Sequence, residues 1–256
     1  MKLLIDIGNT RLKWAIWDGV RLAPGNAIAN GECAVERLIE TWRGISGPES
    51  AWVASVADPS LDARVATSIR AAFGLELAFV HSVASACGVR NAYPHPGHLG
   101  VDRFLGMIAV HAASRQAAVI VGCGTALTLD ALAADGRHLG GLIAPSPALM
   151  QRALRGNAAR LGDAGEVHVV EMADDTADAI ESGTRLAAVA LIERFVAVAV
   201  KRLGAQPALV LTGGGAADLS EHLTPPCTVE SQLVLAGLAR LADSGEWKPT
   251  RAGTLK

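Results

Sequence analysis

The sequence predicts an α/β protein built from two related domains. Short apolar stretches bounded by turn residues alternate with segments of helical periodicity, as in layered α/β folds. A strand, a Gly/Thr turn, a second strand and an Asp-Gly turn occur at residues 3–19 and return, altered, at 119–136. A length of 256 residues suits one large domain or two modest ones, and this repeat favours two. We therefore divide the chain into residues 1–115 and 116–256, with room for the final helix to pack back on the first half.

The elements of the first half follow from periodicity and capping signals. After the opening hairpin, an apolar stripe at i, i+3, i+4 and i+7 from Val35 predicts a helix. A buried strand is expected at 51–56 and a shorter one at 75–80. Between them, Asp58-Pro59 predicts a helix start, with Asp58 as the N-cap and proline at the first helical position.

The alternation continues to the end of the second half. Residues 93–100, still in the first half, contain two prolines and two glycines, so we expect a loop that leads into a helix ending near residue 114. Further helices are expected near 148–154, 176–203 and 233–241, and further strands at 167–170 and 208–211. The longest apolar stretch lies in the helix over 176–203 and is interrupted by Glu193 and Arg194, which predicts a buried helix and not a membrane span.

Composition excludes several classes of protein. Charged residues make up 19% of the chain, too few for a disordered protein, and a net charge of −2 favours neither a nucleic acid nor a membrane as partner. Only three apolar residues separate Lys2 from Asp6, which excludes a signal peptide. The four cysteines are scattered without a Cys-x-x-Cys pair, and the seven histidines form no metal-binding pair. We expect a globular cytoplasmic protein without a zinc site.

The loop of the first hairpin has the residue types of a phosphate-binding loop. Gly8 allows a close backbone approach to a phosphate, and Thr10 can donate its hydroxyl to a phosphate oxygen. Asp6, at the strand end, is placed to hold hydrated magnesium, and Lys13 or Arg11 can compensate charge. The alternative is a plain hairpin in which Asp6 caps a turn. No Gly-Lys-Ser/Thr follows, so this is not a Walker A loop.

The return of the hairpin motif later in the chain favours the phosphate-binding loop over the plain hairpin. The second copy places Gly122-Cys123-Gly124-Thr125 after an apolar strand, where the first copy has its own loop. Two facing hairpins of this kind can clamp a polyphosphate, whereas a chance turn has no reason to return at the same place in a repeat. The repeat therefore favours chemistry on ATP.

A second constellation follows the Pro-rich loop, in the segment from Leu99 to Arg103. Asp102 is a candidate base that orients and deprotonates a substrate hydroxyl, and the planar fork of Arg103 suits a substrate carboxylate. The alternative is an N-cap with a local ion pair. Tyr93, the only tyrosine of the chain, either closes over a small substrate or anchors the loop by packing.

Two further motifs lie in the second half. Gly213-Gly214-Gly215 after a buried strand would admit a flat ligand such as adenine, or form a flexible strand-to-helix turn. Thr176 lies at an acidic helix start. It either presents its hydroxyl to an anionic substrate or belongs to an ordinary helix terminus stabilised by its acidic neighbours.

Together these residues resemble the type III pantothenate kinases, of the acetate kinase, sugar kinase and actin superfamily. The resemblance runs through nearly the whole chain. It rests on Asp6, Ile7, Gly8, Asn9 and Thr10, continued through Arg11, Leu12 and Lys13; on Tyr93; on Gly100, Val101, Asp102 and Arg103; and on Thr125 and Thr176. It implies that the segment from Asp6 to Lys13 and Thr125 bind ATP. It also implies that Tyr93, the segment from Gly100 to Arg103 and Thr176 bind pantothenate, with Asp102 as proton acceptor.

The resemblance carries further expectations. It implies two ribonuclease H-like (actin-like) domains with mixed sheets flanked by helices, a homodimer formed through the second half, and ATP with magnesium. Many members also need potassium or ammonium, held in part by an aspartate of the second loop. Here that position is Gly122, so the cation is held by carbonyls and water, or the dependence on it is weaker.

We therefore predict a pantothenate kinase that transfers the γ-phosphoryl group of ATP, the first step toward coenzyme A. Two alternatives stay open. One is a kinase of the same superfamily acting on another small hydroxyl compound. The other is a nucleotide-binding regulatory protein, against which the presence of Asp6, Thr10 and Asp102 argues, since a pure binder needs no base.

Overall fold

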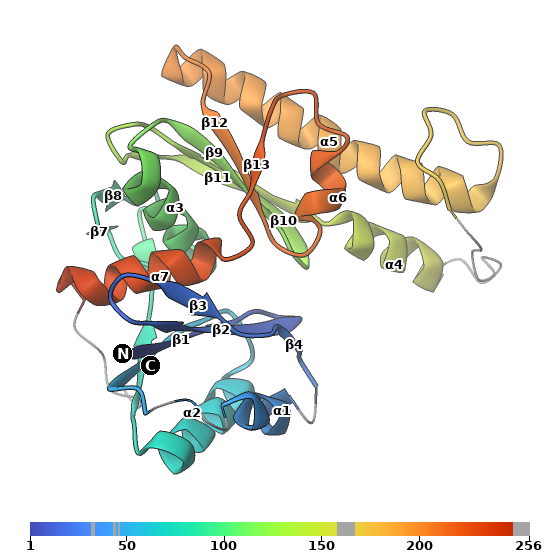
Figure 1. The fold of residues 1–256 in the computed structure, drawn as a ribbon. Coiled ribbons are helices and arrows are strands. Elements are labelled where there is room, and N and C mark those ends of the chain that lie inside the picture. Colours follow the sequence, from blue (N-terminus) through green and yellow to red (C-terminus); the bar gives the residue numbers. More distant parts are fainter. Residues whose placement is uncertain (32–33, 43–44, 46, 158–166, 248–256) are drawn as a thin grey trace. The chain divides into compact units, whose positions relative to one another are not determined.

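The computed structural model describes residues 1–31, 34–42, 45, 47–157 and 167–247, and it confirms an α/β architecture of mixed sheets flanked by helices (Figure 1). The chain forms two compact units. Unit 1 contains residues 1–115, the short segment Asp135–His138 and residues 232–247. Unit 2 contains Gln116–Ala134 and Leu139–Ser231. Residues 232–247 thus lie in unit 1, a position for which the predicted division at 115/116 left room.

The sheet of unit 1 is built around the opening hairpin. Its strands are β1 (Lys2–Ile7), β2 (Arg11–Trp17), β3 (Leu22–Pro24), β4 (Ile28–Ala29), β5 (Ser50–Ser55) and β6 (Leu77–Val80). Their order is β3-β2-β1-β5-β6, with β4 also paired to β2. β1 runs antiparallel to β2 and parallel to β5, so the sheet is mixed.

The α-helices in the described part of unit 1 are α1 (Ala34–Thr41), α2 (Pro59–Phe73), α3 (Val101–Ser114) and α7 (Leu233–Ser244). Unit 1 also has a small hairpin, β7 (Ser85–Ala86) and β8 (Val89–Arg90), and a 3-10 turn, η1 (Pro96–His98). The predicted start of α2 is confirmed, since the Asp58 side chain accepts a hydrogen bond from the Ser60 amide. Gly74 ends this helix at φ 66°, a left-handed conformation that glycine adopts without steric cost.

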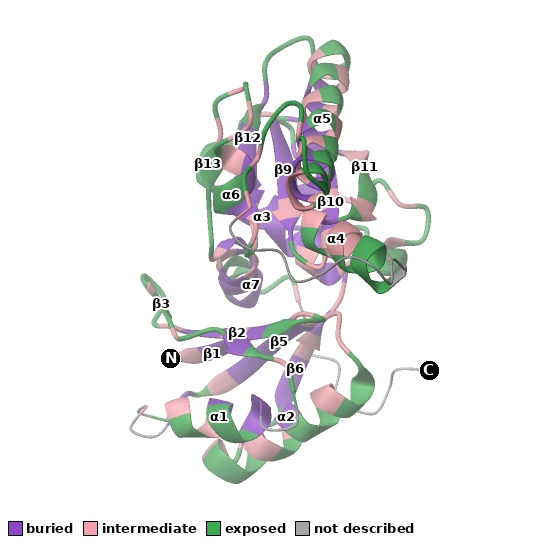
Figure 2. Cartoon of the chain, turned by 90° about the vertical axis from the view of Figure 1, so that its right-hand side faces the viewer, coloured by how far each residue is buried: buried purple, intermediate pink, exposed green. Residues whose placement is uncertain are grey.

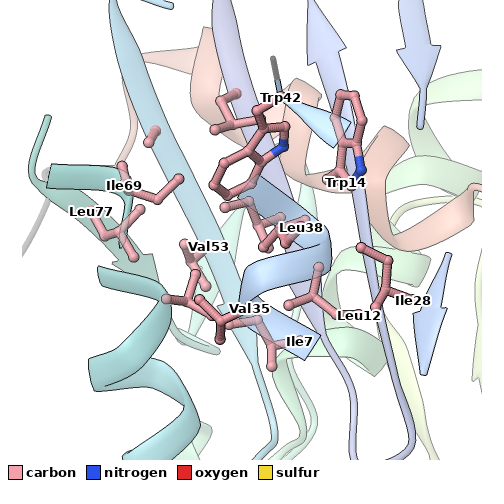
Figure 3. Close-up of a cluster of buried hydrophobic side chains, with 14 of the residues drawn as sticks. Ile7, Leu12, Trp14, Ile28, Val35, Leu38, Trp42, Val53, Ile69 and Leu77 are labelled. Carbon is pink, nitrogen blue, oxygen red and sulfur yellow. The ribbon is translucent and has the colours of Figure 1, made fainter. Parts of the chain in front are cut away.

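α1 and α2 bury an apolar cluster against one face of this sheet (Figure 3). Val53 of the sheet packs in this cluster with Leu38 of α1 and Ile69 of α2, all three fully buried. Trp42 meets Trp14 edge-on, with 6.4 Å between ring centroids. The outward faces of the two helices are exposed (Figure 2). The apolar stripe predicted from Val35 is therefore the face that holds α1 on the sheet.

α3 and α7 pack directly against each other within unit 1 (Figure 1). A Cβ atom on Gly237 would lie 2.0 Å from the carbonyl oxygen of Leu105, so the two backbones touch. At the far end of α7, Asp243 accepts a hydrogen bond from Trp17 Nε1 at 2.6 Å and pairs with Lys2. These contacts explain why the C-terminal helix belongs to unit 1.

Unit 2 repeats the hairpin arrangement of unit 1. Its strands are β9 (Ala118–Cys123), β10 (Ala126–Leu132), β11 (His138–Pro145), β12 (Ala208–Thr212) and β13 (Thr228–Val229), in the order β11-β10-β9-β12-β13. Its helices are α4 (Pro147–Asn157), α5 (Thr176–Leu203) and α6 (Ala216–Ser220). β9 runs antiparallel to β10 and parallel to β12, as β1 does to β2 and β5. The internal repeat read in the sequence is therefore a structural repeat.

The long helix α5 covers the second sheet with its small and branched residues, among them Ala188, Ile192 and Val196. The strand predicted at 167–170 is wrong. The amide of His168 donates to Asp178 Oδ1 and the amide of Val170 to Ser182 Oγ, so side chains of α5 take the place of a neighbouring strand. Within the described residues, no helix is long and apolar enough to cross a membrane.

Candidate active site

The predicted first phosphate loop, residues 8–10, is a tight connection between β1 and β2. The amide of Gly8 donates to the carbonyl oxygen of Arg11 at 3.0 Å. Asn9, Thr10 and Arg11 are exposed. The neighbouring Ile7 and Leu12 are fully buried in the apolar cluster, so these two can meet a nucleotide only through their backbone. Two buried anchors thus hold an exposed polar loop in place.

Asn30 braces this loop from outside, and sequence reasoning missed it. Its Nδ2 donates to the carbonyl oxygen of Gly8 at 2.7 Å, and its amide donates to the carbonyl oxygen of Thr10 at 2.8 Å. Its Oδ1 is buried without a hydrogen-bond partner among the described residues. The only sequence signal was the Asn30-Gly31 pair, which predicts a turn and nothing about the loop that it supports.

Asp6 lies at the end of β1, directly across from Lys13 on β2. Loss of water around the carboxyl group raises its pKa to about 7, and the negative charge of Asp102 adds to this shift. The charge of Lys13 opposes it. The structure therefore brings the strand-end carboxylate and the candidate base of α3 within electrostatic range of each other. Two neighbouring carboxylates, one of them poorly hydrated, favour a cation between them.

Asp102 lies in the first turn of α3, whose N-cap is Gly100 and not Asp102. The interpretation of Asp102 as the N-cap is therefore wrong. A Cβ atom on Gly100 would lie 2.6 Å from Asp102 Oδ1, so the carboxylate folds back over the bare Cα of the glycine. Val101 is buried, and this fixes the start of the helix. Gly100 leaves the space that this carboxylate position requires.

Tyr93 and Arg103 form a pair beside Asp102. Arg103 is buried, and its Nη1 donates to the Tyr93 hydroxyl at 3.1 Å. Its Cζ lies 5.8 Å from the centre of the Tyr93 ring, a cation–π distance. The Tyr93 amide donates to Asn91 Oδ1, which holds the start of the loop. Tyr93 is thus anchored, and the same contacts fix the position of the Arg103 guanidinium.

The predicted second phosphate loop is in unit 2, between β9 and β10. The amide of Gly124 donates to the carbonyl oxygen of Ala126 at 3.0 Å, the counterpart of the Gly8 bond in the first loop. The carbonyl oxygen of Thr125 accepts from Ser146 Oγ at 2.9 Å, which ties the loop to the start of α4. Thr125 is partly exposed.

The glycine run after β12 packs on this loop. Gly213 has φ +99°, and a Cβ there would lie 2.5 Å from the carbonyl oxygen of Cys123. The amide of Gly215 donates to the same oxygen at 3.0 Å. Gly213 therefore has a structural reason to be glycine, whereas Gly214 is exposed and open to a flat ligand.

Gly122 faces a hydroxyl and not an open cation site. It pairs with Thr128 across the β9–β10 ladder, and a Cβ on residue 122 would lie 2.5 Å from Thr128 Oγ1. Nowhere in the described residues do three or more His, Cys, Asp or Glu side chains form a metal-binding group. This position does not fit a cation held by a carboxylate of the second loop.

Thr176 is the first residue of α5, with Asp175 as N-cap; the Asp175 side chain accepts from the amides of Ala177 and Asp178. It lies on the wall of a cavity of about 840 Å³ between α4 and α5. Most of the lining is apolar: Pro145, Leu149, Met150, Ala153, Leu154, Ala173, Ala179, Ile180 and Gly183, with Asp174, Asp175, Thr176 and Thr184 as polar members. The threonine hydroxyl thus borders a space large enough for a small organic molecule.

The candidate residues fall into two groups. Unit 1 holds Asp6, Thr10, Tyr93, Asp102 and Arg103, with Asp6 in electrostatic contact with Asp102 and Arg103 bonded to Tyr93. Unit 2 holds Thr125 and Thr176. The two related units, each built on a strand-turn-strand hairpin, define the class of protein as that of the actin-like kinases.

Solved structures share this fold. A structure described as a 2-dehydro-3-deoxygalactonokinase from Sinorhizobium meliloti matches with a TM-score of 0.56 and 17% identity, over 96% of this chain and 99% of that one. One described as a Baf family transcriptional activator from Campylobacter jejuni matches with a TM-score of 0.60 and 20% identity, over 95% and 98%. Identities this low concern the fold alone.

Sequence comparison identifies the family. The family model of type III pantothenate kinase matches residues 2–198. Type III pantothenate kinases from Xanthomonas campestris and Stenotrophomonas maltophilia are 41% and 42% identical over 93% of this chain and 96% of theirs. The one from Nitrosococcus oceani is 36% identical over 94% of each chain. The chain belongs to the type III pantothenate kinase family, and the predicted resemblance is confirmed.

Proposed function

We propose that this chain phosphorylates pantothenate, transferring the γ-phosphoryl group of ATP to the primary hydroxyl to give 4′-phosphopantothenate, the first step toward coenzyme A. One observation carries the proposal. At the start of α3, Asp102 lies beside the buried Arg103–Tyr93 pair and within electrostatic range of Asp6 at the end of β1. A small-molecule kinase that acts on a hydroxy acid requires a base, a cationic group that binds the acid, and a carboxylate near the metal ion.

Asp102 is the proposed base. Its carboxylate accepts the proton of the pantothenate hydroxyl as the oxygen forms its bond to the γ-phosphorus and the bond to the β-phosphate oxygen breaks. Arg103 binds the pantothenate carboxylate through its guanidinium, with Tyr93 and the backbone of Gly100 and Val101 closing the site. Thr176, on the cavity wall between α4 and α5, supports a role as a further pantothenate contact.

The segment from Asp6 to Lys13 and Thr125 are proposed to bind ATP. The exposed Asn9 and Thr10 offer amides and a hydroxyl to phosphate oxygens. Arg11 and Lys13 compensate the phosphate charge. Ile7 and Leu12 contribute through their backbone, because their side chains are buried in the core. A cytoplasmic location, where ATP is available, belongs to the same proposal.

The residues present fit magnesium on the side of Asp6. Its carboxyl group is poorly hydrated and lies within electrostatic range of a second carboxylate, an arrangement that a hydrated divalent cation relieves. When bound, magnesium neutralises phosphate charge during the transfer. The donor set around Gly122 does not fit a potassium or ammonium ion held by a side-chain carboxylate, since Thr128 Oγ1 occupies the space of a side chain at that position.

We also propose a homodimer formed through unit 2. The cavity between α4 and α5 is mainly apolar, and Leu154 on its wall is 48% exposed. Met172, just before α5, is 95% exposed. Exposed apolar side chains around an apolar hollow are typical of a surface that another chain covers. A second copy of this chain fits the family's expected dimer.

The experiment that tests the function is ATP-dependent phosphorylation of pantothenate by the wild-type protein and by Asp102→Asn. We expect turnover in the wild type and a loss of at least about 100-fold in kcat in the variant, with ATP binding nearly unchanged, because only the general base is removed. A near-normal rate in the variant would contradict the role of Asp102. Wild-type protein that binds ATP but leaves pantothenate unchanged would instead point to another substrate or to a regulatory protein.

The cation dependence is tested in the same assay with sodium, potassium or ammonium as the monovalent cation. Because Gly122 supplies no carboxylate, we expect activity in sodium to stay within about 3-fold of that in potassium, a difference of less than 1 kcal/mol. A rise of 100-fold in potassium would contradict this and would indicate a site made of carbonyls and water.

A further inference from the structure

His138, which sequence reasoning did not single out, lies against the proposed substrate loop. It is only 2% exposed. Its imidazole stacks on the ring of Tyr93, with 6.1 Å between centroids and 13° between planes. Its Nδ1 accepts a hydrogen bond from the Ala92 amide at 3.4 Å, next to Tyr93 in the chain. The Tyr93 ring and the Ala92 amide therefore both contact the buried His138 side chain.

The segment that carries His138 is held firmly within unit 1. It is the segment Asp135–His138, the end of the connection from β10 together with the first residue of β11. The amide of Arg90, on β8, donates to the carbonyl oxygen of Gly136 at 2.8 Å, and Arg90 Nη2 pairs with Asp135 Oδ2 at the same distance. Gly136 has φ +81°, and a Cβ there would lie 2.0 Å from the carbonyl oxygen of Gly88. Backbone contact with the β7–β8 hairpin fixes where the imidazole stands.

Tyr93 links His138 to Arg103, the residue proposed to bind the substrate carboxylate. Its hydroxyl accepts a hydrogen bond from Arg103 Nη1, and the guanidinium carbon of Arg103 lies 5.8 Å from its ring centre. A planar side chain stacked on one neighbour and bonded to another has few orientations left. The direction of the Arg103 fork therefore depends on the orientation of the Tyr93 ring.

We propose that His138 is a positioning residue for the acid substrate: by stacking on Tyr93, it orients the Tyr93 hydroxyl and, through it, the guanidinium of Arg103 for the substrate carboxylate. The inference rests on the proposed function, since it assumes that Tyr93 and Arg103 bind pantothenate. His138 itself takes no part in proton transfer. Its effect falls on substrate binding and not on the phosphoryl-transfer step.

Two matched variants separate stacking from hydrogen bonding. His138→Gln keeps an acceptor for the Ala92 amide but removes the aromatic face, whereas His138→Phe keeps the face and removes the acceptor. We expect His138→Gln to raise KM for pantothenate about 3- to 10-fold, the loss typical of one aromatic contact, with kcat and KM for ATP nearly unchanged. His138→Phe should stay within about 2-fold of wild type, a difference of the size expected when stacking is kept. His98→Leu, which removes an exposed histidine of the same loop, serves as control.

A spectroscopic readout does not depend on activity. Tyr93 is the only tyrosine, so protein labelled with ¹³C-tyrosine gives one set of ring signals that need no assignment by mutation. A stacked imidazole shifts these signals through its ring current. We expect the shift to be lost in His138→Gln and largely kept in His138→Phe. Pantothenate should move the signal of the wild type at lower concentration than that of His138→Gln.

Several results would overturn the inference. These are a Tyr93 signal that is the same in wild type and His138→Gln, a wild-type KM in that variant, or His138→Phe as impaired as His138→Gln. Parallel loss of kcat, of ATP affinity and of thermal stability in His138→Gln, or failure of this variant to fold, would show a general structural role instead. If wild-type protein does not phosphorylate pantothenate, the proposed function fails, and the Tyr93 signal alone then decides whether His138 orients this ring.

Discussion

At the candidate active site, the fold holds the Asp6 carboxyl group where its ionised form is unfavourable. This carboxyl group has lost water and lies within range of the negative charge of Asp102, so its pKa rises to about 7 from the value of 3.8 of a free side chain. A raised acid pKa means that the folded state binds this proton more tightly than the unfolded state. The free energy of unfolding therefore falls as the pH rises from about 4 to about 7.

Asp6→Asn removes this titration and should stabilise the protein at high pH. At pH 4 the carboxyl group is largely protonated in the folded state and partly so in the unfolded state, so the variant and the wild type should differ little. Above pH 7 the variant should gain up to about 4 kcal/mol in free energy of unfolding, the equivalent of the raised pKa, while kinase activity is lost. Denaturant unfolding at pH 4 and pH 8 measures this. A variant less stable than wild type at pH 8 would contradict the electrostatic account.

Gly100 contributes to the candidate site because it has no Cβ atom. Gly100→Ala would place a methyl group where Asp102 Oδ1 now lies, 2.6 Å from the new Cβ. The backbone angle of Gly100, φ −54°, suits alanine, so the carboxylate moves and the chain does not. We expect a loss in kcat of about 10- to 100-fold, the order typical of a misplaced catalytic group.

The same variant should keep its fold, with a change in free energy of unfolding below about 1 kcal/mol, as expected for an N-cap substitution. Gly97→Ala is a matched control, because a Cβ there has no neighbour within 4 Å. It should keep both rate and stability. Equal loss of activity in the two variants would indicate that mobility of the whole loop, and not the space above Gly100, is what matters.

At the scale of elements, the pairing of α3 with α7 stabilises the start of α3 and so the site. The two helices touch at backbone level where Gly237 meets Leu105, and α7 also contacts β1. Close backbone approach of this kind needs a residue without a side chain. The element that carries Asp102 and Arg103 is thus held by α7.

Gly237→Ala should therefore destabilise unit 1. The new methyl group would lie 2.0 Å from a carbonyl oxygen, and the helices would have to separate, at a cost of about 1–3 kcal/mol or more. Gly156→Ala in α4, where a Cβ meets nothing within 4 Å, should leave stability unchanged or raise it by up to about 1 kcal/mol. Thermal or denaturant unfolding of both variants makes the comparison. A neutral Gly237→Ala would contradict the close packing of α3 on α7.

At the scale of the whole molecule, the proposed dimer is the property that a mutation can test most directly. Met172→Glu places a charge on a side chain that is 95% exposed near the apolar cavity of unit 2. If another copy of the chain covers this surface, burying the charge is costly, and light scattering should show a shift toward the mass of a monomer. Val20→Glu, at a side chain of unit 1 that is 83% exposed, should leave the mass unchanged. A monomeric wild type would contradict the dimer.

Much of this molecule follows from the sequence by itself. The i, i+3, i+4, i+7 stripe from Val35, the Asp58-Pro59 helix start and the repeat of the Gly/Thr hairpin are local signals, and local backbone preferences decide such features. The family, too, follows from motifs in order along the chain. The candidate residues Asp6, Asp102 and Arg103 were found for the same reason, because their types and spacing along the chain indicate metal binding, proton transfer and anion binding.

Only the tertiary structure decided what depends on atoms far apart in the chain. Residues 167–170 do not form a strand, because side chains of α5 bind their amides. The last helix joins the first unit, because Gly237 lets it reach α3. Asn30 behind the first phosphate loop and His138 against Tyr93 have no signal in their own neighbourhood. Propensity and periodicity act over a few residues, whereas close packing, loss of water and stacking are set by which distant segments meet.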